Sequence, residues 1–186
     1  MKIINNKKEA IEELKRISTR TNSDNNNKIN TIVEEILQEV KISGDKAVEK
    51  YTKKFDGFDP NPMQVNADQI KKAWDETDSN LKRSLEIAHE RIKKFHEKEI
   101  PSSFSIKGEH GEIVQRRWKP VKNAGIYIPG GRAAYPSTVL MNAIPAKVAG
   151  VEEIIMVSPG NKEGQINKTV LAAAHLSGVN LSLIHI

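Results

Sequence analysis

Four residues near the middle of the chain have types and a spacing that could serve ligand binding: Tyr127, Gly130, Gly131 and Arg132. Paired glycines after an apolar segment let the backbone approach a phosphate closely, and an arginine can bind a phosphate or a carboxylate. A tyrosine offers the same ligand an aromatic face and a hydroxyl donor. The spacing is not that of the G-x-G-x-x-G loop, so a simple turn, a solvated Arg132 and a core Tyr127 are the alternatives.

The histidines do not predict a metal site. The chain has five histidines and no cysteine. His89 and His96 are seven residues apart, which places them roughly 10 Å apart along a helix and too far apart to bind one zinc ion. His110 falls in a predicted turn, and His175 falls in a predicted apolar helix. The sequence therefore assigns no catalytic and no metal-binding residue to this chain.

The glycine pair is predicted to lie in a strand-loop-helix-strand unit. Residues 125–128 form a short apolar run bounded by Gly and Pro, which is typical of a strand buried on both faces. A helix of about twelve residues should follow, with Ser137 or Thr138 as its N-cap and Gly150 at its end. Residues 152–158 predict the next strand, stopped by a Pro-Gly pair.

Such a unit indicates where a ligand would bind. Two parallel strands joined through a helix form a right-handed crossover, and ligands bind beyond the carboxyl ends of the strands. The loops over residues 129–136 and 158–164 follow those ends. We therefore expect the binding chemistry of this chain in these two loops.

The remaining elements predict an α/β fold with two differently built parts. Apolar residues at helical spacing recur up to residue 101, interrupted by a polar run over residues 18–28 that reads as a loop. A hairpin is expected over residues 102–121, and a second apolar helix should end at Gly178. We predict a helical amino-terminal region over residues 1–101 and a parallel β-α-β unit over residues 102–186.

Composition narrows the class of protein. The net charge is +5, with 29 Lys and Arg against 24 Asp and Glu. The basic cluster around Trp118 has no accompanying nucleic-acid-binding motif, so a nucleic acid is not expected as a partner. No stretch is apolar enough for a signal peptide or a membrane span, and the lack of cysteine fits a cytoplasmic protein. We expect a soluble, cytoplasmic protein.

The sequence also resembles a known family, histidinol dehydrogenase. The segment that carries most of the resemblance is YIPGGRAAYPSTVLM, within residues 125–160. The strings SGDKAVEKYTKKFDGF and IKKFHEKEIP precede it, and LAAAHLSGV follows it, in the order found in that family. The resemblance extends over about residues 29–179.

The resemblance implies a fold, an activity and cofactors. The fold would be an incomplete Rossmann-like unit akin to that of aldehyde dehydrogenases. The activity would be the oxidation of L-histidinol to L-histidine through the aldehyde, in histidine biosynthesis, with NAD⁺ as oxidant. Zinc would hold the substrate, and the enzyme would be a homodimer. By the same resemblance, Tyr127 would contact the cofactor, with Gly130 and Gly131 beside it.

The resemblance leaves the reacting groups outside this chain. The family's zinc ligands and its Glu-His pair are expected beyond residue 186, so the chain alone is predicted to be inactive, as an amino-terminal part of a truncated enzyme. The last residues, NLSLIHI, depart from the family pattern. They resemble translated adaptor sequence, and residues 181–186 are therefore expected to be foreign, holding at most an edge position in the sheet.

Two other functions are compatible with the residues. One is a different NAD- or nucleotide-binding enzyme that shares the crossover unit. The other is a non-catalytic nucleotide-binding or assembly module. The complete gene distinguishes them, because only a histidinol dehydrogenase would continue into the zinc ligands and the Glu-His pair.

Overall fold

A computed structural model describes residues 4–18, 24–130 and 133–184. By its internal contacts the chain divides into two units, Met1–Tyr51 and Thr52–Ile186. The sequence placed a boundary after residue 101, whereas the structural division comes after Tyr51. The reason is that helices α4 (Ala67–Asp75) and α5 (Ser79–Glu97) pack on the helices that cover the sheet.

The first unit is helical, as the periodicity predicted. Helix α1 spans Lys7–Ser18 and begins at Asn6, whose side chain accepts hydrogen bonds from the backbone N–H groups of Lys8 and Glu9. Helix α2 spans Asp24–Ser43, so the polar run expected to be a loop up to residue 28 is helical from residue 24 onwards. Helix α3 spans Asp45–Phe55, and between α2 and α3 Gly44 has a φ of 55°.

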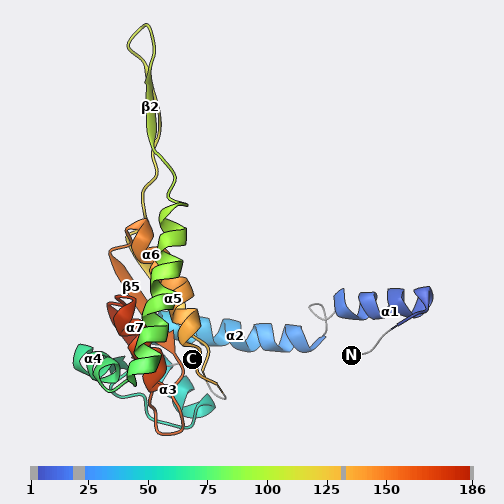
Figure 1. Cartoon of the computed structure of the whole chain (residues 1–186). Helices are drawn as coiled ribbons and strands as arrows, with labels where there is room; N and C mark the ends of the chain where they lie inside the picture. Colours follow the sequence, from blue (N-terminus) through green and yellow to red (C-terminus); the bar gives the residue numbers. More distant parts are fainter. Residues whose placement is uncertain (1–3, 19–23, 131–132, 185–186) are drawn as a thin grey trace. The chain divides into compact units, whose positions relative to one another are not determined.

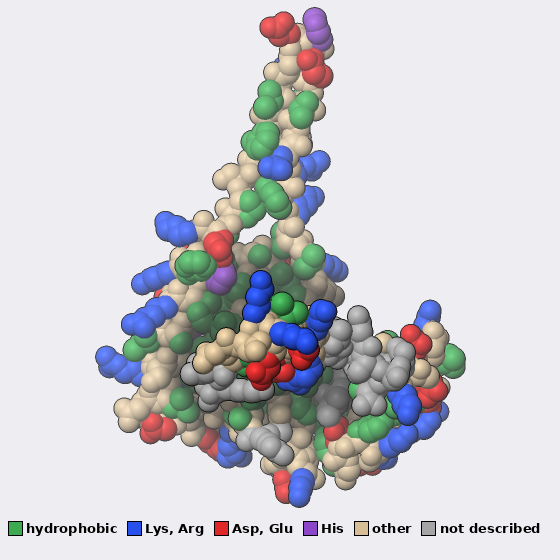
Figure 2. Space-filling model, turned by 90° about the vertical axis from the view of Figure 1, so that its right-hand side faces the viewer, with side chains coloured by type: hydrophobic (Ala, Val, Ile, Leu, Met, Phe, Trp, Pro, Cys, Tyr) green, Lys and Arg blue, Asp and Glu red, His purple; other side chains and the backbone are tan. Residues whose placement is uncertain are grey.

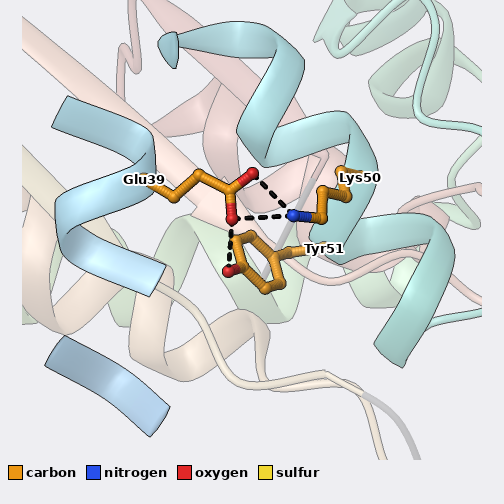
Figure 3. A network of polar contacts seen from close by, with 3 residues as sticks. All are labelled: Glu39, Lys50 and Tyr51. Atoms are coloured by element: carbon orange, nitrogen blue, oxygen red, sulfur yellow. Dashed lines mark hydrogen bonds and ion pairs between the residues drawn. The ribbon is translucent and has the colours of Figure 1, made fainter. Parts of the chain in front are cut away.

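A polar contact joins α2 to α3 inside this unit (Figure 3). The Glu39 carboxylate accepts hydrogen bonds from Lys50 Nζ at 2.6 and 2.8 Å and from the Tyr51 hydroxyl at 2.6 Å. Its hydrogen bond to Tyr51 raises the pKa of that phenol, and its hydrogen bond to Lys50 raises the pKa of that amine. Because these groups are solvated, the contact fixes the helix pair in register more than it stabilises the fold.

The second unit is built on a four-stranded sheet with the order β1-β6-β5-β4. Strands β4, β5 and β6 are parallel, and β1 is antiparallel to β6. Its strands are β1 Gln64–Val65, β4 Asn123–Tyr127, β5 Glu153–Ser158 and β6 Leu181–Ile184, and its helices besides α4 and α5 are α6 Pro136–Ala149 and α7 Lys168–Leu176. Within the described ranges, no helix is long and apolar enough to cross a membrane.

The predicted crossover unit is present as β4-α6-β5. Gly150 ends α6 in the left-handed conformation with a φ of 90°, as expected. The expected hydroxyl cap is wrong: Tyr135 is the N-cap residue and makes no side-chain capping bond. Pro136 takes the first helical position instead, where its fixed φ suits a helix start and its missing N–H leaves no donor unpaired.

One face of this sheet forms the core with the helices. The buried hydrophobic residues of β4 and β5 are Ile126, Ile154 and Met156, and Ile128 directly after β4 is buried as well, each at most 9% exposed. They pack with buried residues of α6 and α7 and with Leu85 of α5. Alternate residues of β4 and β5 are therefore on the core face, and the residues between them, including Tyr127, are on the other face.

Strand β6 differs from expectation. It follows α7 as the second crossover predicts, but it pairs with β5 on one side and with β1 on the other. The expectation of an edge position for residues 181–186 is wrong, because Leu181–Ile184 form an interior strand. Strand β1 itself was not predicted, since two residues carry no periodic signal.

The predicted hairpin is present as β2 (Phe104–Lys107) and β3 (Ile113–Arg116), which pair antiparallel. Figure 1 shows it extending from the rest of the second unit as a separate arm. All eight strand residues are exposed.

Candidate functional site

The two predicted loops meet at the carboxyl edge of the parallel strands. Tyr127 and Val157 are paired at the ends of β4 and β5, and Ile128 N–H donates to the Val157 carbonyl at 2.8 Å. A hollow of about 160 Å³ lies beyond this point. It is lined from both loops and from the start of α7, by Pro129, Gly130, Ala133, Ala134, Ser158, Pro159, Gly160, Asn161, Gln165, Asn167 and Val170.

At Gly130 the two loops approach each other closely. A Cβ atom at this position would lie 2.6 Å from Pro159 Cγ and 3.1 Å from the Pro159 carbonyl oxygen. Only glycine fits without moving one of the loops. Gly131, the second predicted glycine, and Arg132 lie outside the described residues.

This close approach gives a testable expectation. Gly130→Ala should lower the free energy of unfolding by about 1–3 kcal/mol, because the added methyl group forces the two loops apart. Thermal melting of the variant measures the effect. Gly125→Ala is the matched control, since a Cβ there meets nothing within 4 Å. Equal melting temperatures for the two variants would contradict the close contact.

The second loop is held in place by Asn161. Its side-chain oxygen accepts hydrogen bonds from the backbone N–H groups of Glu163 at 3.0 Å and Gln165 at 2.8 Å. Phe58 packs against the same loop, because a Cβ at Gly164 would lie 2.9 Å from its ring. The loop that faces Gly130 is therefore held by the hydrogen bonds of Asn161 and by packing against the Phe58 ring.

Two helices begin beside the hollow. Helix α6 starts shortly after Ala133 and Ala134, and α7 starts after Asn167, whose side-chain oxygen accepts a hydrogen bond from Thr169 N–H at 2.9 Å. Helix N-termini present unpaired N–H groups and a positive partial charge. None of the described lining residues carries a charge. The hollow therefore suits an anionic group such as a phosphate.

Tyr127 is near this edge but does not line the hollow. Its side chain is 56% exposed, on the face of β4 opposite the buried Ile126. Within this chain, Tyr127 is therefore not a core residue. The structure places Tyr127 and Gly130 at the same edge of the sheet, with the tyrosine ring available to a ligand that approaches from the open face.

The described histidines lie elsewhere and have ordinary partners. His89 and His96 are next to Glu90 and Glu99, and His175 stacks on Trp74 with ring centroids 5.9 Å apart. No group of three or more potential metal ligands occurs among the residues whose positions are described.

A larger hollow, of about 340 Å³, lies at the opposite edge of the sheet, near the carboxyl ends of α5 and α6. None of the residues that line it belongs to the two predicted loops, and none belongs to the first turn of a described helix. We therefore place the candidate site at the Gly130 edge.

Comparison of the whole chain with known proteins shows which family it belongs to. The sequence model of histidinol dehydrogenase matches residues 19–183. The chain belongs to the histidinol dehydrogenase family. It is 85% identical over 179 residues to the histidinol dehydrogenase of Prochlorococcus marinus strain MIT 9312, covering 96% of this chain and 41% of that protein. For the enzyme of Prochlorococcus marinus subsp. pastoris strain CCMP1986, identity is 74% over 180 residues, covering 97% and 42%.

A solved histidinol dehydrogenase has the same architecture. The crystal structure of the enzyme from Elizabethkingia anophelis is similar with a TM-score of 0.79 and 34% sequence identity, covering 85% of this chain and 36% of that one. This confirms the predicted fold class of helices followed by part of a parallel α/β sheet. The chain spans about two-fifths of the length of the histidinol dehydrogenases it matches.

Sequence reasoning missed the polar residues that line the hollow opposite Gly130. Asn161, Gln165 and Asn167 all line it. A usable signal existed for two of them, since asparagines after a strand and before a helix are typical of turns and N-caps. The sequence did not show that these turns lie opposite Gly130, because their position depends on the pairing of β4 with β5.

Proposed function

We propose that the complete protein to which this chain belongs oxidises L-histidinol to L-histidine, with NAD⁺ bound at the Gly130 edge. The observation that supports this is the hollow itself, which combines the glycine approach, two helix N-termini and an uncharged lining. These features fit the pyrophosphate of a dinucleotide. Membership of the histidinol dehydrogenase family gives the substrate.

The residues of this chain would bind and orient the cofactor. The missing side chain of Gly130 lets Pro159 pack against it and so holds the two loops together beside the hollow, and the α6 and α7 amino termini would donate to the pyrophosphate oxygens. Tyr127 would pack its ring against the nicotinamide or adenine half on the open face. Bound NAD⁺ accepts a hydride, and the conversion of an alcohol to a carboxylate removes two hydrides and consumes one water.

Zinc does not fit the described part of the chain. Those residues hold no set of three potential ligands, so we derive no step through a metal here. That zinc binds to ligands beyond residue 186 stays a prediction. We also propose a cytoplasmic homodimer as the working form.

Tyr127 provides the test of the cofactor site. In the complete protein, Tyr127→Ala should raise the KM for NAD⁺ about 10-fold, a loss of about 1.4 kcal/mol of binding, because the ring no longer covers the cofactor. The KM for histidinol should change much less. Steady-state kinetics with each substrate varied in turn give both values.

Two controls make the result decisive. Tyr127→Phe keeps the ring and should stay close to wild type, which separates packing from hydroxyl donation. The melting temperature should be almost unchanged, since the side chain is 56% exposed. Unchanged NAD⁺ kinetics, or unfolding of the alanine variant, would show that Tyr127 has no cofactor role.

A further inference from the structure

Phe58 is the least exposed of the four phenylalanines in the chain, all of which lie in its described part. The other three, Phe55, Phe95 and Phe104, are each at least 50% exposed. Phe104 belongs to the β2-β3 hairpin, whose hydrophobic side chains are open to solvent in Figure 2. Phe58 is half-buried instead, so most of its ring packs against protein.

The ring of Phe58 packs against two glycines of the loop that follows β5. A Cβ atom at Gly160 would lie 3.0 Å from Phe58 Cζ, and a Cβ atom at Gly164 would lie 2.9 Å from Cδ2 and 3.3 Å from Cε2. These separations are shorter than the roughly 3.5–4.0 Å of an ordinary contact between carbon atoms. A side chain on either glycine would therefore collide with the ring, which lies directly on the loop backbone.

The segment that carries Phe58 is held on both sides of the ring. On the amino-terminal side, Gly57 has a φ of 77°, and its N–H donates to the Thr52 carbonyl at 3.2 Å. On the carboxyl-terminal side, the Asp59 carboxylate forms an ion pair with Lys53 at 2.8 Å. The ring is thus carried by a turn of defined geometry between α3 and β1.

The loop that the ring contacts is anchored at its ends and bonded across its middle. Ser158 and Ile166, which flank it, are both buried. Asn161 N–H donates to the Gln165 carbonyl at 2.9 Å, and Gly164 N–H donates to the Asn161 carbonyl at 2.9 Å. Because the loop is closed by its own hydrogen bonds, we expect it to shift as a whole between its two buried ends.

This loop supplies one wall of the Gly130 hollow. The wall consists of Pro159, Gly160, Asn161 and Gln165. Pro159 meets Gly130 on the other loop, and Gly160 meets the Phe58 ring, so two contacts determine where the wall stands. Loss of the ring removes one of them and leaves the loop free to move, which changes the width of the hollow.

We propose that Phe58 is a positioning residue of the cofactor site, whose ring holds the loop over residues 159–165 where it fits the pyrophosphate of NAD⁺. Phe58 is not among the residues that line the hollow, so it acts through the loop. This inference rests on the proposed NAD⁺ site. A ligand that fits only one position of a loop binds more weakly in proportion to the fraction of molecules that have left that position.

A purely structural role of Phe58 predicts a different result. If the ring only filled space in the fold, its removal would lower the melting temperature and leave the kinetic constants of the folded protein unchanged. A positioning role instead changes the KM for NAD⁺ in protein that is still folded, because the wall of the hollow is displaced.

Steady-state kinetics of the complete protein separate these two roles. Phe58→Ala should raise the KM for NAD⁺ about 5-fold, as expected when the loop keeps its binding position in only about one-fifth of the molecules. The kcat and the KM for histidinol should stay within about 2-fold of wild type, since the change removes binding of the cofactor alone. Phe58→Leu keeps the carbons nearest Gly164 but not the ring tip nearest Gly160, so its KM for NAD⁺ should be intermediate.

Phe95→Ala is the matched control. It removes the same ring from the end of α5, where the ring is mostly exposed and does not line the hollow. Its KM for NAD⁺ should equal that of wild type. An equal rise in Phe95→Ala and Phe58→Ala, or no rise in Phe58→Ala, would overturn the inference. If Phe58→Ala does not fold, a folded Phe58→Leu protein with an unchanged KM for NAD⁺ overturns it in the same way.

Hydrogen exchange of the complete protein shows whether the loop itself has moved. In Phe58→Ala the amides of residues 161–165 should exchange at least about 5-fold faster than in wild type, while those of β5 should not change. NAD⁺ should slow exchange in this loop of the wild-type protein, and do so less in Phe58→Ala at the same concentration. Unchanged exchange of the loop in Phe58→Ala would overturn the inference.

Failure of this inference is distinct from failure of the proposed function. A wild-type complete protein that forms no NADH, and whose loop exchanges at the same rate with and without NAD⁺, would contradict the proposed function and the role of Phe58 with it. A wild-type protein that uses NAD⁺, together with a Phe58→Ala protein of unchanged KM, would overturn the role of Phe58 alone.

Discussion

The 186-residue chain, purified and supplied with NAD⁺, Zn²⁺ and L-histidinol, is expected to form no NADH above the rate without protein. Removal of a proton from an alcohol needs a positioned base, and holding the alcohol on a metal needs several ligands. The described histidines sit beside Glu90, Glu99 and Trp74 or at the arm tip, away from the Gly130 hollow. None of the described residues that line that hollow can act as a general base and take the proton.

Absorbance at 340 nm during an incubation of hours measures this rate. The loss relative to the complete enzyme should be essentially total, since removing even one catalytic group commonly costs about 10²–10⁴-fold. The control is the complete protein. Turnover by the short chain at a rate near that of the complete protein would mean that its residues include the reacting groups.

Deletion of residues 181–186 should abolish cooperative thermal unfolding. Strand β6 is interior, so its removal breaks the ladders to both β5 and β1. It also uncovers the β5 side of the core, where Met156 and Ile154 are fully buried. We therefore expect the deletion to lower the free energy of unfolding by several kcal/mol. A typical domain has a free energy of unfolding of only about 5–15 kcal/mol in total.

Ser182→Ala is the control for this deletion, because it keeps the strand. Ser182 is fully buried, and its hydroxyl has no hydrogen-bond partner among the described atoms. Removal of an unpaired buried hydroxyl is neutral or stabilising by about 1 kcal/mol, so the melting temperature should stay the same or rise. A deletion variant that melts like wild type would contradict the interior position of β6.

The foreign origin of residues 181–186 stays a prediction. Their alternating pattern, LSLI, is that of a strand, and the structure uses it as one. An unpaired hydroxyl at Ser182, facing the core, is a local defect in that strand. Structural use and native origin are separate questions, and the deletion experiment addresses only the first.

Local signals in the sequence were enough to predict the centre of the fold. The apolar run ending at Tyr127, the glycine loop and the left-handed Gly150 are all encoded by neighbouring residues, so β4, α6 and β5 appear where expected. The candidate site followed from the same unit, because the carboxyl edge of parallel strands is a general binding position.

Features that depend on distant residues were missed. Strand β1 exists because Gln64 and Val65 pair with Leu183 and Ser182, more than a hundred residues away. The interior position of β6 depends on that same pairing. The N-cap of α6 was misplaced for a local reason. Ser137 and Thr138 carry the hydroxyl groups typical of N-caps, but Pro136 takes the first helical position, so the helix begins earlier and uses neither hydroxyl as its cap.

The most direct test of the account is the amount of NADH that the complete protein forms from a known, limiting amount of L-histidinol. The account predicts two NADH per histidinol, because conversion of the alcohol to the carboxylate releases two hydrides. Formation of no NADH, or a final ratio of one with the aldehyde as product, would contradict it.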